Sequence, residues 1–255
     1  MKRIILSSTL TACFVIIFSF SAFGMTLDLG KNITISDKNN ATSKAWYTDR
    51  EDQEVEPGMQ IKQEWDLEGF FLKDTILSVV GGYDFRDGYG GRTSGDIFLD
   101  IDGDAAYGDI HGAANGPVTS NETYGYEYAL DLDFSSMSYD IIDLAGASTT
   151  TAYYKQNYGS NPWQYAGGGT IIGTGTFGYQ ENLSNTQTGF EGGNHYLISG
   201  FDLDFLGPDA TFIAHYTMSC GNDNLMGAVA TPEPGTIILM GLGLSGLVII
   251  RRKRS

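Results

Sequence analysis

The sequence is poor in cysteine and in basic residues. Of its two cysteines, Cys13 lies in an apolar stretch near the N-terminus and Cys220 lies far from it. With one cysteine left after removal of that stretch, an internal disulfide framework is excluded. Fifteen Lys and Arg face 31 Asp and Glu, for a net charge of −16. A chain this acidic does not bind nucleic acid or anionic lipid by charge.

The common catalytic signatures are also missing. The sequence contains no Gly-x-Ser-x-Gly, no His-Glu-x-x-His, no phosphate loop and no dinucleotide fingerprint. A pair of carboxylates could hydrolyse a glycosidic bond, but 31 acidic residues make such a pair impossible to pick out. We therefore expect no enzymatic activity, and a glycan-cleaving enzyme is kept as the second alternative.

Sustained helical periodicity is absent between residues 25 and 231, where a period of two prevails instead. Alternation is clear in residues 59–67, 75–80, 97–101, 124–134, 139–144, 150–156, 195–205 and 210–219. About ten short strands joined by Gly- and Asn-rich turns predict an all-β fold, a β-sandwich of jelly-roll or lectin-like type. The irregular, glycine-rich interval 157–193 is predicted to form long loops.

The N-terminal residues are typical of a signal peptide. Lys2 and Arg3 precede the apolar run 4–23, which ends in Ala22-Phe23-Gly24. A charged region, an apolar helix and a small-x-small site predict export by the Sec machinery and cleavage by signal peptidase after residue 24. The alternative is a lipoprotein box at 10–13 that ends in Cys13.

The last residues have the order of a motif, a short span and a basic tail. Pro232, Glu233 and Pro234 precede a largely apolar run at 236–250, and the chain then reads Arg251, Arg252, Lys253, Arg254 and Ser255. About 15 helical residues span a little over 20 Å, less than the hydrocarbon core of a bilayer. Basic residues beside a short span stay on the cytoplasmic side. The pattern predicts a transmembrane helix at 236–250 and a cytoplasmic tail at 251–255.

This C-terminal region resembles the PEP-CTERM sorting signal of Gram-negative bacteria, with Pro232-Glu233-Pro234 as its motif. The resemblance implies that an exosortase cuts near the motif. The protein would be held first at the inner membrane and then delivered to the cell surface or the extracellular space. Residues 80–85, 94–100 and 215–223 resemble blocks in PEP-CTERM proteins of unassigned function.

Between the two ends, the patterns predict three further units. Residues 25–58 are weakly patterned and are expected to form a weakly ordered arm. Residues 59–221 carry the β-sandwich. Residues 222–235 are expected to be a linker that contains the Pro-Glu-Pro motif.

Acidic residues at alternate positions suggest a cation site. Asp100, Asp102 and Asp104 alternate, with Asp96 before them and Asp109 after them. Closely spaced carboxylate oxygens are the ligands that Ca²⁺ requires, so Ca²⁺ is the predicted cofactor. The loop is not an EF-hand, because alanine and histidine stand where that loop has its glycine and its bidentate glutamate. The alternative interpretation is a solvated strand face that ends in a tight turn.

Two further sets of residues have a functional and a structural interpretation. Trp163 and Tyr165 are two positions apart, so both rings lie on one side of an extended chain and could stack on a sugar. Aromatic residues also fill sandwich cores. His215 and Cys220 are of the types found in metal sites and catalytic dyads, but they could equally close the end of the last strand.

Taken together, the patterns predict an exported cell-surface protein that acts as a non-catalytic component of the extracellular polysaccharide or biofilm matrix. Its expected partners are exosortase, the export machinery and an extracellular polysaccharide. A lectin-like carbohydrate-binding module is the first alternative.

Overall fold

The computed structural model describes residues 25–35, 51–56, 58–105, 118–153 and 158–229. The predicted signal peptide, the Pro232-Glu233-Pro234 motif, the span at 236–250, the basic tail and Asp109 lie outside the described residues. Within the described ranges, no helix is both long enough and apolar enough to cross a membrane.

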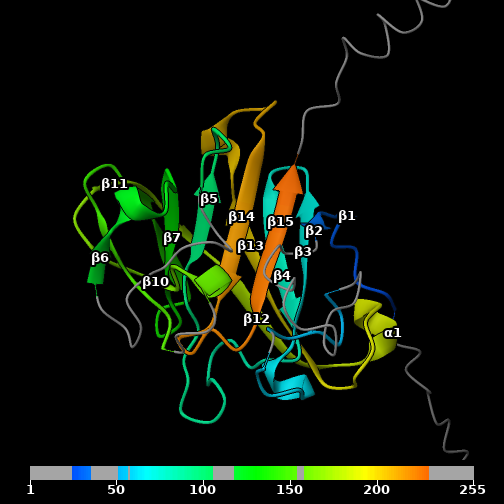
Figure 1. The fold of residues 1–255 in the computed structure, drawn as a ribbon. Helices are drawn as coiled ribbons and strands as arrows, with labels where there is room; N and C mark the ends of the chain where they lie inside the picture. The colour runs from blue at the N-terminus through cyan, green and yellow to red at the C-terminus, as the bar shows by residue number, and fades with distance from the viewer. Residues whose placement is uncertain (1–24, 36–50, 57, 106–117, 154–157, 230–255) are drawn as a thin grey trace, which may run out of the picture.

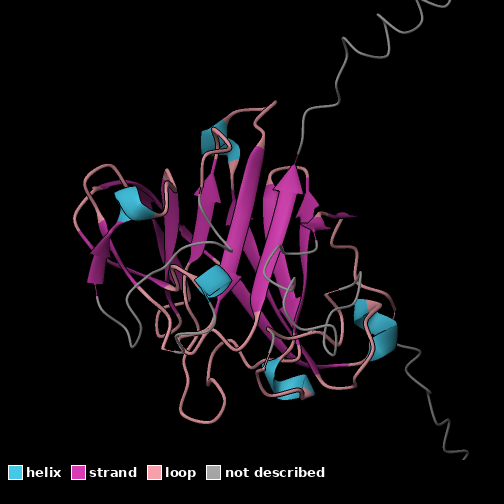
Figure 2. Cartoon of the chain, in the orientation of Figure 1, coloured by secondary structure: helices cyan, strands magenta, loops and turns pink. Residues whose placement is uncertain are grey.

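The described chain folds into two antiparallel β-sheets that face each other, with a small third sheet beside them (Figures 1 and 2). The five-stranded sheet has the order β1 (Lys31–Asn32), β3 (Leu67–Lys73), β4 (Ile76–Gly81), β13 (His195–Asp202) and β12 (Gly178–Leu183). The seven-stranded sheet has the order β11 (Thr170–Thr176), β8 (Ser138–Asp143), β7 (Tyr128–Asp133), β5 (Ile97–Asp100), β14 (Phe212–Thr217), β15 (Asn224–Val229) and β2 (Thr34–Ile35).

The remaining elements are short. The third sheet has the order β10 (Gln164–Gly167), β9 (Ser148–Thr150) and β6 (Val118–Ser120). Helix α1 (Asn185–Thr188) and 3-10 turns at Gln63–Trp65, Asn121–Thr123, Tyr158–Ser160 and Asp204–Leu206 complete the described structure. The predicted all-β sandwich is confirmed at the level of two facing sheets, and its jelly-roll or lectin-like type stays a prediction.

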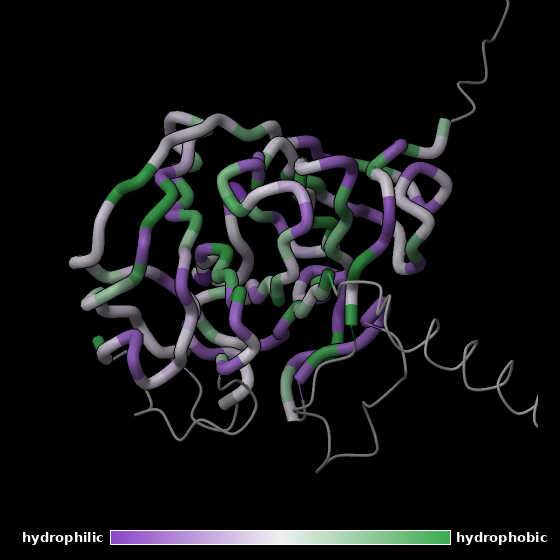
Figure 3. Tube along the Cα trace, turned by 90° about the horizontal axis from the view of Figure 1, so that it is seen from above, coloured by the Kyte–Doolittle hydropathy of each residue, from purple (hydrophilic) through white to green (hydrophobic). Residues whose placement is uncertain are grey.

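The core lies between the two large sheets. Phe70, Leu77 and Phe201 come from the five-stranded sheet, and Ile97 and Leu99 face them from the seven-stranded sheet. Each fully buried side chain of this size contributes about 1.5–3 kcal/mol through removal of apolar surface from water. Figure 3 shows hydrophobic and hydrophilic residues interleaved along the chain, as the period of two requires.

The outer face of the seven-stranded sheet is covered as well. Phe98, which points away from the main core, packs in a second cluster with Tyr124, Tyr126, Ala129 and Ile142. Strand β5 is therefore buried on both faces, and Asp96 and Asp100 beside Phe98 are only 3% and 1% exposed. The alternative interpretation as a solvated strand face is therefore wrong for Asp96 and Asp100, whereas Asp102 and Asp104 are exposed in the turn that follows the strand.

The predicted arm at 25–58 is packed against the sandwich in its described parts. Strands β1 and β2 pair with β3 and β15, one in each large sheet, and Ile33 between them is buried in the core. Val55 is buried, and the Glu56 N–H donates to the Asn222 carbonyl at 3.1 Å. The prediction of a weakly ordered arm is thus corrected for residues 25–35 and 51–56.

The predicted linker at 222–235 begins too early. Strand β15 pairs with β14 along six residues, and Leu225 and Met226 are fully buried. A segment that supplies core side chains and two strand pairings belongs to the sandwich, so the domain extends to Val229. The sequence pattern missed this strand because its alternation is broken by the small residues Gly227 and Ala228.

The interval predicted as loops at 157–193 holds strands β10, β11 and β12. The glycines within it make room for neighbours. A Cβ on Gly175 would lie 2.3 Å from the Tyr139 ring on strand β8. Strand β11 therefore needs glycine to sit beside β8, and the composition reflects close approach and not a long loop.

Candidate cation site at the acidic turn

The turn that follows β5 is organised by the carboxylate of Asp100. One Asp100 oxygen accepts hydrogen bonds from the N–H groups of Asp102 and Gly103 at 3.1 and 2.7 Å, and the other accepts from Ala105 at 3.2 Å. Gly103 has a φ of +85°, a conformation that glycine adopts without strain. The buried Asp100 thus folds the loop, and the exposed Asp102 and Asp104 extend from it.

A fourth carboxylate joins the turn from the residue just before strand β7. Asp100, Asp102, Asp104 and Glu127 each offer one oxygen, and these oxygens all lie within 4.8 Å of one another. Glu127 is held in place because its side chain accepts the Ile101 N–H at 2.7 Å. The sequence interpretation did not include Glu127. The pairing of β5 with β7 sets Leu99 opposite Tyr128 and so brings Glu127 to the turn.

The electrostatics of the turn favour a cation. The negative charge of Asp102 raises the pKa of Asp104, and burial together with Asp102, Asp100 and Asp104 raises the pKa of Glu127. Like charges are thus the main cause of the shift at Asp104 and add to the effect of burial at Glu127. A hard divalent cation would relieve this repulsion, and four carboxylate oxygens supply at least half of the six to eight that Ca²⁺ takes. The turn can hold Ca²⁺ on chemical grounds, with carbonyl oxygens and water as further ligands.

Asp96, predicted as a ligand of the same cation, is held elsewhere. Its two oxygens accept the N–H groups of Leu132 and Tyr165 at 3.0 and 2.8 Å. Burial and the charge of Asp131 raise the pKa of Asp96 to about 8. Asp96 therefore ties β7 and β10 to β5, and it stands outside the group of carboxylates at the turn. Asp109 lies outside the described residues.

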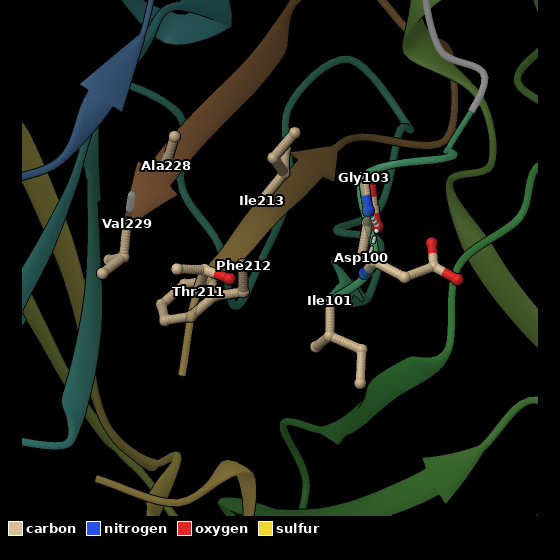
Figure 4. Close-up of a pocket in the computed structure, with 9 residues that line it drawn as sticks. Asp100, Ile101, Gly103, Thr211, Phe212, Ile213, Ala228 and Val229 are labelled. Atoms are coloured by element: carbon tan, nitrogen blue, oxygen red, sulfur yellow. Dashed lines mark hydrogen bonds between the residues drawn. The ribbon is translucent and has the colours of Figure 1, made fainter. Parts of the chain in front are cut away.

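Two recesses flank the turn. One, of about 360 Å³, is lined by the turn and by apolar residues at the facing ends of β14 and β15. Figure 4 shows the turn residues Asp100, Ile101 and Gly103 on one side of this recess and Ile213, Ala228 and Val229 on the other. The other, of about 520 Å³, is lined by Asp104, Glu127 and further polar and aromatic residues that include Asn121, Glu122, Tyr126 and Asp143. The four carboxylates thus stand between an apolar recess and a polar one.

Trp163 and Tyr165 lie away from this turn, beside and on strand β10. Tyr165 packs against the second cluster, and its hydroxyl donates to the Gly168 carbonyl at 2.6 Å. Trp163 is half-buried, and its carbonyl accepts the Asp96 N–H at 2.9 Å. Residues two apart share one side of a strand, and for Tyr165 that side faces the sandwich. Sugar stacking by these rings stays a prediction.

His215 and Cys220 are both buried. A ring nitrogen of His215 lies 2.8 Å from the Pro162 carbonyl, and the ring stacks on Tyr126 at 5.7 Å. Burial lowers the pKa of His215 to about 4 and raises the pKa of the Cys220 thiol. In the described part of the chain, neither residue belongs to a group of three or more metal-ligating side chains. Their surroundings are those of core residues.

Comparison with known proteins places the sorting signal directly after the sandwich. The family model of the PEP-CTERM protein-sorting motif matches residues 230–254, which begin one residue after strand β15 ends at Val229. Neither a curated protein nor a solved structure matches the chain. The sequence-based resemblance is confirmed, and the residues of the predicted motif fall within the match. The chain therefore carries a PEP-CTERM sorting signal, which marks it as an exported protein that is sorted by exosortase through the membrane to the cell surface.

Proposed function

We propose that the β-sandwich is a non-catalytic component of the extracellular polysaccharide matrix and that it carries Ca²⁺ at the acidic turn. The observation that carries the proposal is the sorting motif at residues 230–254, directly after the last strand. Cleavage near the motif would release the whole sandwich outside the cell. A compact, strongly acidic domain without a membrane anchor is suited to a soluble matrix role.

The acidic turn supplies a chemical link to a polymer. An acidic protein repels an anionic polysaccharide, and a divalent cation that binds carboxylates of both partners removes the repulsion. Asp102 and Asp104 are exposed on the turn, so a bound cation there keeps positions open to an outside ligand. The proposal thus gives Ca²⁺ a bridging role at Asp100, Asp102, Asp104 and Glu127.

The test is fractionation of the matrix from producing cells. We expect the processed chain to co-purify with polysaccharide in millimolar Ca²⁺ and to be released by EDTA. The variant Asp102→Asn with Asp104→Asn should be retained less well, and Asp209→Asn, an exposed residue outside the turn, should behave like the wild type. Full recovery in the medium with or without Ca²⁺ would contradict the matrix role. Release of reducing sugar by the purified chain would contradict the non-catalytic role.

One observation favours a lectin-like module as the second candidate. The recess of about 520 Å³ beside the turn combines carboxylates, amides and tyrosines, which is the chemistry of a sugar site. Affinity electrophoresis in gels that contain the host polysaccharide tests it with Trp163→Ala and Glu122→Gln. Loss of retardation in Trp163→Ala alone would favour stacking at Trp163 and Tyr165, and loss in Glu122→Gln alone would favour the recess. Equal mobility with and without polymer would remove this candidate.

A further inference from the structure

A second group of carboxylates lies at the other end of strand β14 from the acidic turn. Ile213 near the start of β14 pairs with Asp100, whereas Thr217 at its end donates to the carbonyl of Asp223. Near Asp223, the residues Asp52, Asp66 and Glu68 each place one oxygen within 4.8 Å of the other two. Asp66 and Glu68 are only 2% and 1% exposed, so this group is far more buried than the turn.

One oxygen in this group has no hydrogen-bond partner. Oδ2 of Asp66 accepts hydrogen bonds from the backbone N–H of Gln53 at 3.0 Å and from its side-chain amide at 3.2 Å. Oδ1 of Asp66 is buried and has no donor within the described residues. An unpartnered buried carboxylate oxygen costs free energy unless a positive charge or a donor meets it. Because Asp66 also belongs to a group of three carboxylates, a cation fits as the missing partner.

Neighbouring side chains hold the Glu68 carboxylate in place. The His195 ring contacts both oxygens of Glu68 at 2.8 Å, and the Gln63 amide donates to one of them at 2.7 Å. The far side of the His195 ring lies 3.0 Å from the Asn185 side chain. Groups that orient a carboxylate in this way are the usual outer support of metal ligands. Glu68 is therefore fixed before any cation arrives.

A small recess opens beside the group. Asp66 lines this recess of about 180 Å³ together with Gln53, Glu54 and Gln63; Lys62 also lines it, whereas Asp52 and Glu68 do not. In the described part of the chain, no lysine or arginine forms an ion pair with Asp52 or Asp66, and Glu68 is paired with His195. A cation bound to these carboxylates would supply a positive charge there.

We propose that Asp52, Asp66 and Glu68 bind one Ca²⁺ ion at the base of strand β3. The three carboxylates offer oxygen ligands only, which selects a hard cation, and a side-chain oxygen of Gln63 and water from the recess can complete the shell. Ca²⁺ is favoured over Mg²⁺ because Ca²⁺ accepts irregular sets of six to eight oxygen ligands, whereas Mg²⁺ demands near-ideal octahedral geometry. The ion joins residues 51–56 to β3, so it clamps this segment onto the sandwich. The site is independent of the proposed matrix role.

The test is thermal unfolding of the full chain, purified in detergent, in EDTA and in saturating Ca²⁺. The background carries Asp102→Asn and Asp104→Asn so that the acidic turn does not contribute. Ca²⁺ at about a hundred times its dissociation constant should raise the melting temperature by about 5–10 °C, because it binds the folded state alone. Adding Asp66→Asn should abolish the rise, and adding the exposed control Asp209→Asn should leave it intact. Mg²⁺ at the same concentration should give a much smaller rise.

The variant Asp52→Asn keeps the test decisive if Asp66→Asn does not fold. Asp52 is half-buried and lies outside the sheet, so its amide should be tolerated while the Ca²⁺-dependent rise falls by more than half. The proposal is overturned if the background variant shows no rise with Ca²⁺. It is also overturned if the rise persists unchanged in Asp66→Asn or in Asp52→Asn, since the ion would then lie elsewhere.

Discussion

The two carboxylate groups have similar chemistry and opposite environments. At the acidic turn, Asp102 and Asp104 are exposed and belong to one short loop. In the second group, Asp66 and Glu68 are buried and meet Asp52 from a separate segment. Water screens the charges at the turn, whereas the buried charges interact in a medium of low dielectric. Groups of carboxylates with similar chemistry therefore differ greatly in their need for a compensating cation.

The largest expected difference concerns stability without a cation. Asp223, beside the buried group, accepts the N–H groups of Leu67 at 2.5 Å and Asn224 at 2.9 Å. Asp223→Ala leaves two buried donors without partners, so we expect a loss of about 2–5 kcal/mol in the free energy of unfolding. Asp102→Ala, on the exposed turn, should change it by no more than about 0.5 kcal/mol. Urea unfolding of both variants in EDTA measures the difference.

Asp223→Asn is the matched control for this prediction. The amide keeps one acceptor oxygen, so its loss of stability should fall between those of the wild type and Asp223→Ala. Equal losses in Asp223→Ala and Asp102→Ala would show that burial does not separate the two regions.

The pH dependence of stability distinguishes a third kind of carboxylate, represented by Asp96. Its folded-state pKa of about 8 lies well above the ordinary value, because burial and Asp131 outweigh the two N–H donors. The folded state therefore holds a proton that the unfolded state releases. Neutral Asp96 makes its full contribution to the free energy of unfolding below about pH 4. This contribution falls by up to about 1.4 kcal/mol per pH unit until about pH 8.

Urea unfolding of the wild type and Asp96→Asn between pH 4 and pH 9 in EDTA tests this dependence. The stability difference between the two proteins should shrink or reverse as the pH rises, because the amide does not titrate. Parallel curves over the whole range would mean that Asp96 is ionised in the folded state, as a hydrogen-bonded carboxylate can be.

The smallest expected effect lies at the turn itself. Burial is the main cause that raises the pKa of Glu127, and the charges of Asp102, Asp100 and Asp104 add to it. Asp104→Asn removes one of these charges. The pKa of Glu127 should fall by less than about one pH unit, because solvent screens the exposed Asp104. Carbon NMR titration in EDTA measures it. An unchanged pKa of Glu127 would show that the charge of Asp104 does not act on Glu127.

The parts of the fold that followed from sequence are those with clean alternation. Residues 75–80 predicted β4 (Ile76–Gly81), and residues 139–144 predicted β8 (Ser138–Asp143). Strand β11 was missed because Gly173 and Gly175 carry no side chain, so the period of two is invisible there. The side chains of Ile141 and Tyr139 on the neighbouring strand occupy the space that a side chain at Gly173 or Gly175 would need. Local pattern predicts a strand, but not what the strand must accommodate.

The candidate sites divide in the same way. Asp100, Asp102 and Asp104 lie close together because a turn keeps neighbours in the sequence close in space. Asp96 did not join them, since four residues of extended chain separate it from Asp100 by roughly 13 Å. Glu127 and the Asp52, Asp66 and Glu68 group depend on strand register and on the packing of a distant segment. No spacing along the sequence encodes those contacts.

The number of Ca²⁺ ions bound per chain tests the central claim most directly, namely that the acidic sandwich has two separate cation sites. Isothermal titration calorimetry of the full chain in detergent should give two ions for the wild type. It should give one for Asp66→Asn, one for Asp102→Asn with Asp104→Asn, and none for the three substitutions combined. A stoichiometry that stays the same in Asp66→Asn and in the turn variant would contradict the account.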